Sequence, residues 1–120
     1  VPVYLEDEAR ASPDFWLAAR AHHADIGGVT PGSMPPFSRT IADEGALFEG
    51  ERIVRAGRLD EALLRAKLLA PPWPARNVGR NLADLAAQLA ACERGRAELA
   101  RLVAEHGRRP VIAYMAHVQA

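Results

Sequence analysis

Two histidines and an aspartate stand close together in one short stretch of the chain, at His22, His23 and Asp25. Imidazole nitrogens and a carboxylate each present a lone pair, so these residue types at this spacing are typical of ligands for a divalent ion such as Mn, Zn or Fe. Two or three ligands do not complete a metal centre, so others must come from elsewhere. The stretch therefore predicts part of a metal site.

A structural explanation fits the same spacing at least as well. Asp often caps a turn that precedes glycine, as Asp25 does before Gly27-Gly28, and histidines often form hydrogen bonds within a core. If the preceding strand continues, His23 and Asp25 share one face and His22 points to the other. If a turn begins instead, His22 and Asp25 can converge.

Other polar residues are candidates for catalysis or substrate binding. Glu44 is a candidate general acid/base, since a carboxylate beside Gly45 can approach a ligand closely, and Asp25 is a second catalytic candidate. Arg76 and Asn81 could bind amide or carboxylate groups of a substrate. The alternatives are a solvated turn for Glu44, and an exposed helix face and helix start for Asn81 and Arg76.

The first half of the chain has a composition typical of short strands and of an irregular loop rich in glycine and proline. β-Formers and apolar residues predict antiparallel strands at Val1–Leu5 and Phe15–Arg20, joined by the charged connection Glu6–Asp14. Glycines and prolines exclude regular structure from Asp25 to Ser38. Further short strands, or a turn with a strand closed by Gly57, are predicted at Gly45–Phe48 and Arg52–Arg55.

The second half has helical periodicity. Apolar spacing of three and four predicts a helix at Leu59–Leu69, which Pro71 and the following prolines end. A long amphipathic helix is predicted at Asn81–His106, and a last one from Pro110 to Ala120. In the long helix, Gly95 and Arg96 interrupt the apolar stripe, so something polar or closely packed is expected to meet it there. The fold class is α+β, with short antiparallel strands and two or three helices.

Composition excludes several functional classes. Fifteen basic residues balance fifteen acidic ones in 120 residues, which leaves no positive field for nucleic acid. No apolar run could cross a membrane, and a single cysteine, Cys92, is expected in a reducing cytoplasm. The preference for arginine over lysine, with many alanines, suggests a bacterial coding sequence.

Several motifs in order resemble the hydantoinase B/oxoprolinase family, and 5-oxoprolinases especially. Together they cover nearly the whole chain, which makes the resemblance more specific than any one motif. They are the run from Ala18 to Pro36 that reads AARAHHADIGGVTPGSMPP, the step Glu44-Gly45-Ala46, the pair Arg76-Asn77 followed by Asn81, Asp84-Leu85 and Gln88, and the segment Ala113-Tyr114-Met115 with His117 and Gln119.

The resemblance implies an ATP-dependent enzyme of two parts. A hydantoinase A-type subunit or fused domain would bind ATP and phosphorylate a small cyclic amide, and the B part would complete ring opening of 5-oxoproline or a hydantoin. A hetero-oligomer is therefore expected. One alternative is a component of a carboxylase for acetone or acetophenone. Another is a non-catalytic assembly module that presents apolar residues of the long helix to a partner, namely Leu85, Leu89, Cys92 and Leu99.

The family also implies where the metal ligands lie. In metal-containing relatives, a histidine matching His22-His23 binds the ion together with a His-x-x-Asp motif, whose place would fall just before Val1. His22 ranks above His23 because the family motif holds that position most regularly, and Asp25 is a ligand or orients one. The chain is accordingly expected to be an internal fragment of the B domain, residues 1–120, and inactive by itself.

Overall fold

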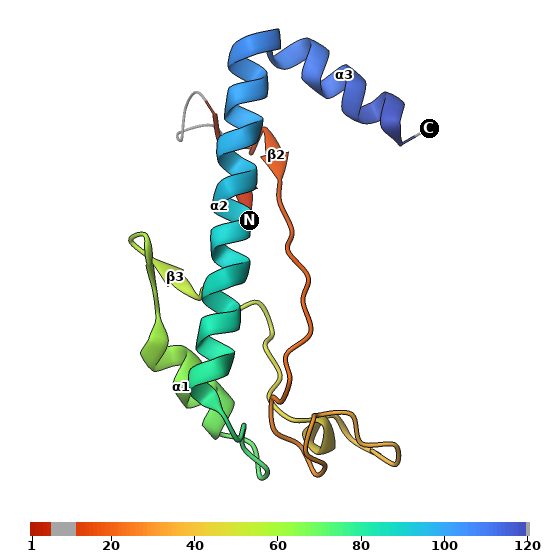
Figure 1. Cartoon of the computed structure of the whole chain (residues 1–120), viewed down its shortest axis with the longest axis vertical. Coiled ribbons are helices and arrows are strands. Elements are labelled where there is room, and N and C mark those ends of the chain that lie inside the picture. The colour runs from red at the N-terminus through yellow and green to blue at the C-terminus, as the bar shows by residue number, and fades with distance from the viewer. Residues whose placement is uncertain (6–11, 120) are drawn as a thin grey trace. The chain divides into compact units, whose positions relative to one another are not determined.

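The computed structural model describes residues 1–5 and 12–119, which form two pairs of short strands, one 3-10 helix and three α-helices (Figure 1). This confirms the predicted α+β class. The described residues divide into two compact units, one of residues 1–20 and 88–120 and the other of residues 21–87. The long helix α2 (Val78–His106) contributes its first turns to the second unit and the remainder to the first.

The first unit contains the predicted hairpin. Strand β1 (Pro2–Val3) pairs antiparallel with β2 (Phe15–Trp16), and Val3 and Phe15 are buried opposite each other. The predicted second strand is too long, because β1 supplies backbone partners only as far as Leu17, whose N–H donates to the Val1 carbonyl at 2.9 Å. The structure has no regular element at 18–20, and most of the predicted connection, residues 6–11, lies outside the described residues.

The side chain of Leu17, the residue after β2, packs on α2 where the sequence predicted a close contact. A Cβ added to Gly95 would lie 3.3 Å from Cδ2 of Leu17, so glycine makes room for that leucine. Arg96 does not take part, because it is exposed and its Nε lies 3.0 Å from Oε2 of Glu93. The prediction of a close approach at mid-helix is confirmed for Gly95 only.

The last two helices begin earlier than predicted. Asn77 accepts a hydrogen bond from the Arg80 N–H at 3.1 Å, as an N-cap residue does, so α2 begins at Val78. Helix α3 (Arg108–Val118) begins two residues before Pro110, which is tolerated there because the first turn needs no amide donor. Nε of Arg108 lies 2.7 Å from Oδ1 of Asp14, an ion pair that joins the start of α3 to the hairpin.

The second unit contains the predicted loop and a second hairpin. No helix or strand forms between Asp25 and Ser38, as predicted, and a short 3-10 helix, η1 (Ile41–Glu44), follows. Strands β3 (Val54–Arg55) and β4 (Arg58–Leu59) pair around Ala56-Gly57, both of which have positive φ, as a type I′ turn requires. The predicted strand at Gly45–Phe48 is wrong, because this segment forms the irregular connection that packs against the loop.

Helix α1 (Glu61–Leu69) supplies the core of this unit. Its N-cap is Asp60, whose carboxylate accepts from the Leu63 N–H at 3.1 Å, so the helix begins two residues later than predicted and Leu59 belongs to β4. Leu64 and Leu68 are fully buried. Leu68 packs in a cluster with Ala46, Ala75, Phe48 and Val78. Within residues 1–5 and 12–119, none of the helices has both the length and the apolar content needed to span a bilayer.

Candidate functional site

The structure places the three predicted ligands in different surroundings. His22 is exposed, the side chain of His23 is 20% exposed, and that of Asp25 is 16% exposed and turned into the loop. The segment is neither a continued strand nor a turn that brings His22 and Asp25 together by hydrogen bonds. Of the two imidazoles, His22 is the one that a solute can reach most freely.

Both oxygens of the Asp25 carboxylate are occupied by hydrogen-bond donors. Oδ1 accepts from the backbone N–H of Gly27 at 2.9 Å and of Arg76 at 3.3 Å. Oδ2 accepts from the N–H of Gly32 at 3.0 Å and from Nη1 of Arg76 at 2.8 Å. The predicted turn-capping role of Asp25 therefore describes the observed geometry. Metal binding or proton transfer by Asp25 would first require it to release donors that hold the loop.

These contacts also determine the acidity of Asp25. Partial desolvation raises the pKa of the carboxyl, but the backbone donors of Gly32, Gly27 and Arg76 and the Arg76 side chain together outweigh desolvation and lower the pKa to about 2. Asp25 is therefore a carboxylate at neutral pH and does not have the raised pKa expected of a general acid.

We expect Asp25 to make folding sensitive to acid. Because its folded-state pKa is below the unfolded value, its contribution is complete above pH 4 and is lost as pH falls toward 2. For a carboxylate that retains some solvent contact, the loss should be about 1–2 kcal/mol. Unfolding free energies from urea titrations between pH 5 and 2.5 should therefore fall more steeply in the native protein than in Asp25→Asn. Equal pH slopes for the two proteins would contradict this interpretation.

Arg76 and Asn81, the predicted substrate-binding residues, both hold the same loop. Nη2 of Arg76 donates to the Gly28 carbonyl at 2.9 Å, in addition to its bonds to Asp25. Nδ2 of Asn81 donates to the Asp25 carbonyl at 2.7 Å, and Asn81 is only 1% exposed. In this conformation Asn81 cannot contact a solute, so its observed role is to fix the backbone beside the histidines.

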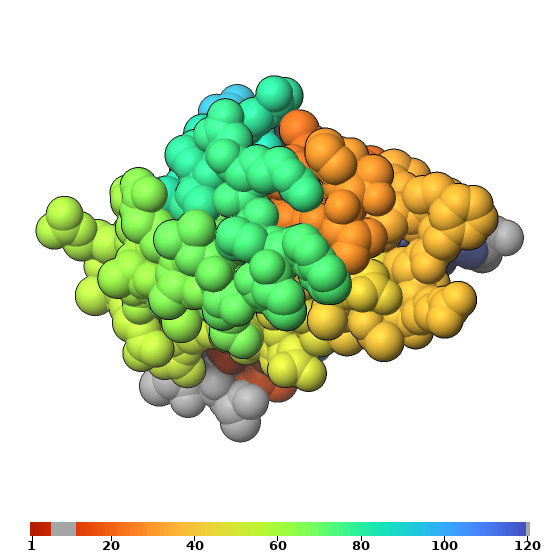
Figure 2. Space-filling model, turned by 90° about the horizontal axis from the view of Figure 1, so that it is seen from below, coloured from red at the N-terminus to blue at the C-terminus, as the bar shows by residue number. Residues whose placement is uncertain are grey.

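Three backbone segments approach one another closely in the loop, at residues 26–28, 43–45 and 73–75. In Figure 2 the surfaces of these parts of the chain, coloured orange, amber and green in that order, are in contact. The Gly28 N–H donates to the Trp73 carbonyl, and the Ala46 N–H to the Ile26 carbonyl, both at 2.9 Å. A Cβ added to Gly27 would lie 2.3 Å from the Trp73 carbonyl oxygen, and one added to Gly45 would lie 2.5 Å from that of Ile26. Glycine is required because only it permits backbones to approach this closely.

The same crossing changes the interpretation of the Glu44-Gly45 step. The close approach that Gly45 permits is to the backbone of Ile26, and no ligand is needed to explain it. Glu44 itself is exposed, and its Oε1 accepts from the Ser38 hydroxyl at 2.8 Å. Its role as a general acid/base stays a prediction.

Sequence reasoning did not identify Asp84 as a partner of the histidine pair. Its Oδ2 lies 3.5 Å from Nδ1 of His23, and this Nδ1 is buried without a hydrogen bond among the described residues. Asp84 lies three residues after Asn81, so the same face of α2 reaches both His23 and the Asp25 backbone. The spacing of three residues between Asn81 and Asp84 was the sequence feature that could have indicated that Asp84 faces the loop.

The residues present fit a divalent ion only in part. His22 is exposed and the side chain of His23 is 20% exposed, so both residues can reach a solute, and a neutral imidazole has one nitrogen lone pair to offer. Asp25 does not fit as a ligand while its four donors remain. In the part of the chain that the structure describes, no three His, Cys, Asp or Glu side chains come together as a metal site, so a closed site needs ligands from other residues.

Comparisons with known proteins agree with the motifs. The family described as hydantoinase B/oxoprolinase matches residues 1–120. A 5-oxoprolinase of Dictyostelium discoideum is 42% identical over 98% of the chain, and 5-oxoprolinase 1 of Arabidopsis thaliana is 41% identical over 88%. A 5-oxoprolinase of Saccharomyces cerevisiae is 37% identical over 88% of the chain.

The chain spans only about 9% of the length of each of these relatives. All three come from eukaryotes, so they do not support the bacterial source that the arginine and alanine content suggested. No solved structure matches the chain. The whole-chain match and the identities above 40% over most of the chain show that it belongs to the hydantoinase B/oxoprolinase family.

Proposed function

We propose that the chain is part of the B component of an ATP-dependent hydrolase that opens 5-oxoproline or a hydantoin at a ring C–N bond. The observation that carries this proposal is the 42% identity to a 5-oxoprolinase over 98% of the chain. The loop geometry is compatible with it, because His22 stands exposed beside a segment held rigidly by Asp25, Arg76 and Asn81. A hydantoinase A-type subunit or fused domain would bind the ATP.

The proposed reaction is a hydrolysis in two stages. The A component transfers a phosphoryl group from ATP to the amide oxygen, which makes the ring carbon a better electrophile. One water then adds its oxygen to that carbon, the C–N bond breaks and the nitrogen receives a proton, which leaves an acyl phosphate. A second water hydrolyses the acyl phosphate to a carboxylate and inorganic phosphate. For 5-oxoproline the product is an open-chain amino acid with a new carboxylate.

In this proposal the residues of the loop have distinct roles. His22 and His23 would hold a divalent ion together with ligands from other residues, and such an ion would supply Lewis acidity. Glu44, an exposed carboxylate oriented by Ser38, is the proposed general acid/base. Asp25, Arg76 and Asn81 act by holding the loop that presents the histidines.

The test is a substrate panel with the full-length protein and its A-type component. We expect ATP-dependent ring opening of 5-oxoproline or hydantoin, followed as ADP release and open-chain product. No carboxylation of acetophenone with bicarbonate is expected. Turnover of acetophenone without ring opening of either amide would identify the carboxylase alternative instead. Residues 1–120 alone should be inactive, and turnover by them would contradict the proposal.

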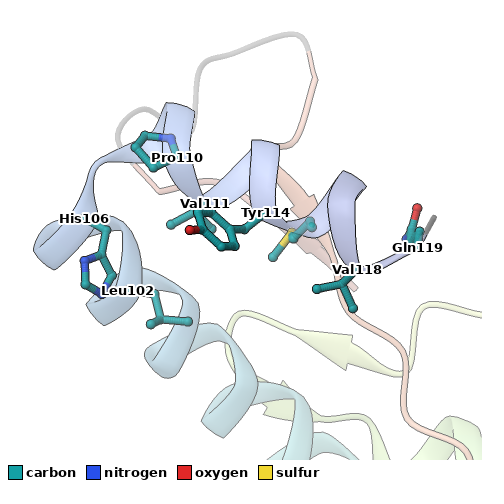
Figure 3. Close-up of a pocket in the computed structure, with 8 residues that line it drawn as sticks. Leu102, His106, Pro110, Val111, Tyr114, Val118 and Gln119 are labelled. Atoms are coloured by element: carbon teal, nitrogen blue, oxygen red, sulfur yellow. The ribbon is translucent and has the colours of Figure 1, made fainter.

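The assembly-module alternative depended on an apolar stripe along α2. Its members, Leu85, Leu89, Cys92 and Leu99, are all half-buried, and this alternative stays a prediction. An exposed apolar groove of about 750 Å³ lies elsewhere, between the end of α2 and α3 (Figure 3). Its lining is Leu102, His106, Pro110, Val111, Tyr114, Met115, Val118 and Gln119.

A further inference from the structure

The last helix of the chain, α3, buries too little surface to be stable by itself. It has 11 residues, and none of them is buried. Helices shorter than about 12–15 residues are marginal in water, and in proteins their stability comes mostly from packing an amphipathic face. Arg108 ties the start of α3 to Asp14 through an ion pair of 2.7 Å, which fixes the first turn. The later turns of α3 therefore need a further packing partner.

One side of α3 has the residue pattern of such an amphipathic face. Four large side chains follow one another at intervals of three and four residues, which places them on the same side of the helix. They are Val111, Tyr114, Met115 and Val118. Tyr114 is 71% exposed and Val118 is 83% exposed. A continuous stripe of this kind marks a contact surface, whereas apolar residues scattered singly over a surface need no explanation.

The stripe forms one wall of the apolar groove of about 750 Å³, and the end of α2 forms the other wall. Figure 3 shows Leu102 and His106 of α2 across the groove from Val111 and Val118 of α3. No Asp, Glu, Lys or Arg of the described residues lines the groove. It therefore suits the apolar side chains of another polypeptide segment, as in grooves that bind amphipathic helices, and not a charged solute.

The length of the relatives indicates where this segment comes from. The family match covers residues 1–120, so the groove lies in the part that is common to the family. The chain spans only about 9% of the length of the 5-oxoprolinases to which it is similar, so most of the polypeptide of those proteins lies outside the matching part. A segment of the same polypeptide is also favoured physically, because it has a high effective concentration and loses little translational and rotational freedom on docking.

We propose that the groove between α2 and α3 is filled by an apolar segment of the same full-length polypeptide, which lies outside residues 1–120 and packs against Leu102, Tyr114 and Val118. The occupant is neither a second copy of the protein nor an A-type subunit. This inference does not depend on the proposed reaction, because it follows from the exposed stripe on α3 and from the length of the relatives.

Photo-cross-linking identifies the occupant. Benzoylphenylalanine replaces Tyr114 in the full-length protein, which is illuminated in the presence of its A-type component. We expect an intramolecular cross-link from position 114 to a segment outside residues 1–120, in a product with the mass of one chain. Arg94 is the control position, because it is exposed and pairs with Glu98 on α2 at 2.7 Å, away from the groove. The same replacement at Arg94 should give a several-fold lower yield of that product.

Three cross-linking results would overturn the proposal. The first is a product that joins two copies of the protein, and the second is one that joins the protein to the A-type component. The third is a yield at Tyr114 that does not exceed the yield at Arg94, or products confined to residues 1–120.

Hydrogen exchange of the unsubstituted full-length protein tests the same inference without any replacement. If a segment covers the groove, the amides of residues 112–118 should exchange more than about 100-fold slower than their intrinsic rates, because exchange requires the covering segment to leave. A marginal helix that nothing covers gives only a few-fold slowing. Exchange of residues 112–118 in that fast range, while the middle of α2 stays protected, would overturn the proposal.

Discussion

Replacing His22 with alanine should abolish most of the catalytic activity of the full-length protein and reduce its metal content. His22 is exposed, has no partner that needs it for folding among the described residues, and is the most accessible imidazole of the loop. Removing a residue that hydrogen-bonds to a metal ligand lowers metal affinity or activity about 10–100-fold, and removing the ligand itself should cost more. We therefore expect turnover to fall by more than about 100-fold. ATP-dependent ring opening and elemental analysis of the same sample measure both effects.

His106→Ala is the matched control for this substitution. His106 is an exposed histidine at the end of α2, 55% exposed, and lies in the other compact unit. We expect its removal to leave turnover and metal content near native values. Native activity and metal content in His22→Ala would instead show that His22 is not a metal ligand required for catalysis.

Replacing Gly28 with alanine should unfold much of the loop. Gly28 has φ +91°, and an added Cβ would lie 2.6 Å from the Asp43 carbonyl oxygen and 2.9 Å from the Glu44 carbonyl carbon. Both atoms belong to the backbone, so neither can move aside cheaply. Conformational strain and overpacking together should cost about 3–5 kcal/mol, a large part of the stability of a domain. The midpoint of urea unfolding measures this cost.

Gly32→Ala isolates the conformational part of that cost. Gly32 has a similar φ of +86°, but nothing lies within 4 Å of an added Cβ. Only the left-handed strain remains, so we expect a loss of about 1–2 kcal/mol. If the two variants lost equal stability, the close backbone crossing would not be what requires glycine at position 28.

The elements that the sequence predicted well depend on local patterns. Apolar residues three and four apart specified α1 and α2, and the Gly/Pro-rich stretch excluded regular structure from the loop, because both effects act between near neighbours. The turn-capping role of Asp25 was also predictable, since its contact with Gly27 spans two residues. Errors at helix starts arose at Asp60 and Asn77, whose capping side chains set the boundary.

The sequence by itself therefore determined the family motifs, the helices, the loop and the candidate imidazoles. Only the tertiary structure decided what the other polar residues do. Arg76 reaches Asp25 across 51 residues and Asn81 reaches its carbonyl across 56, so no local spacing could show that both hold the loop. Likewise, Asp84 meets His23 only because the loop folds back on α2. Contacts between distant segments depend on packing, which residue types and spacing do not specify.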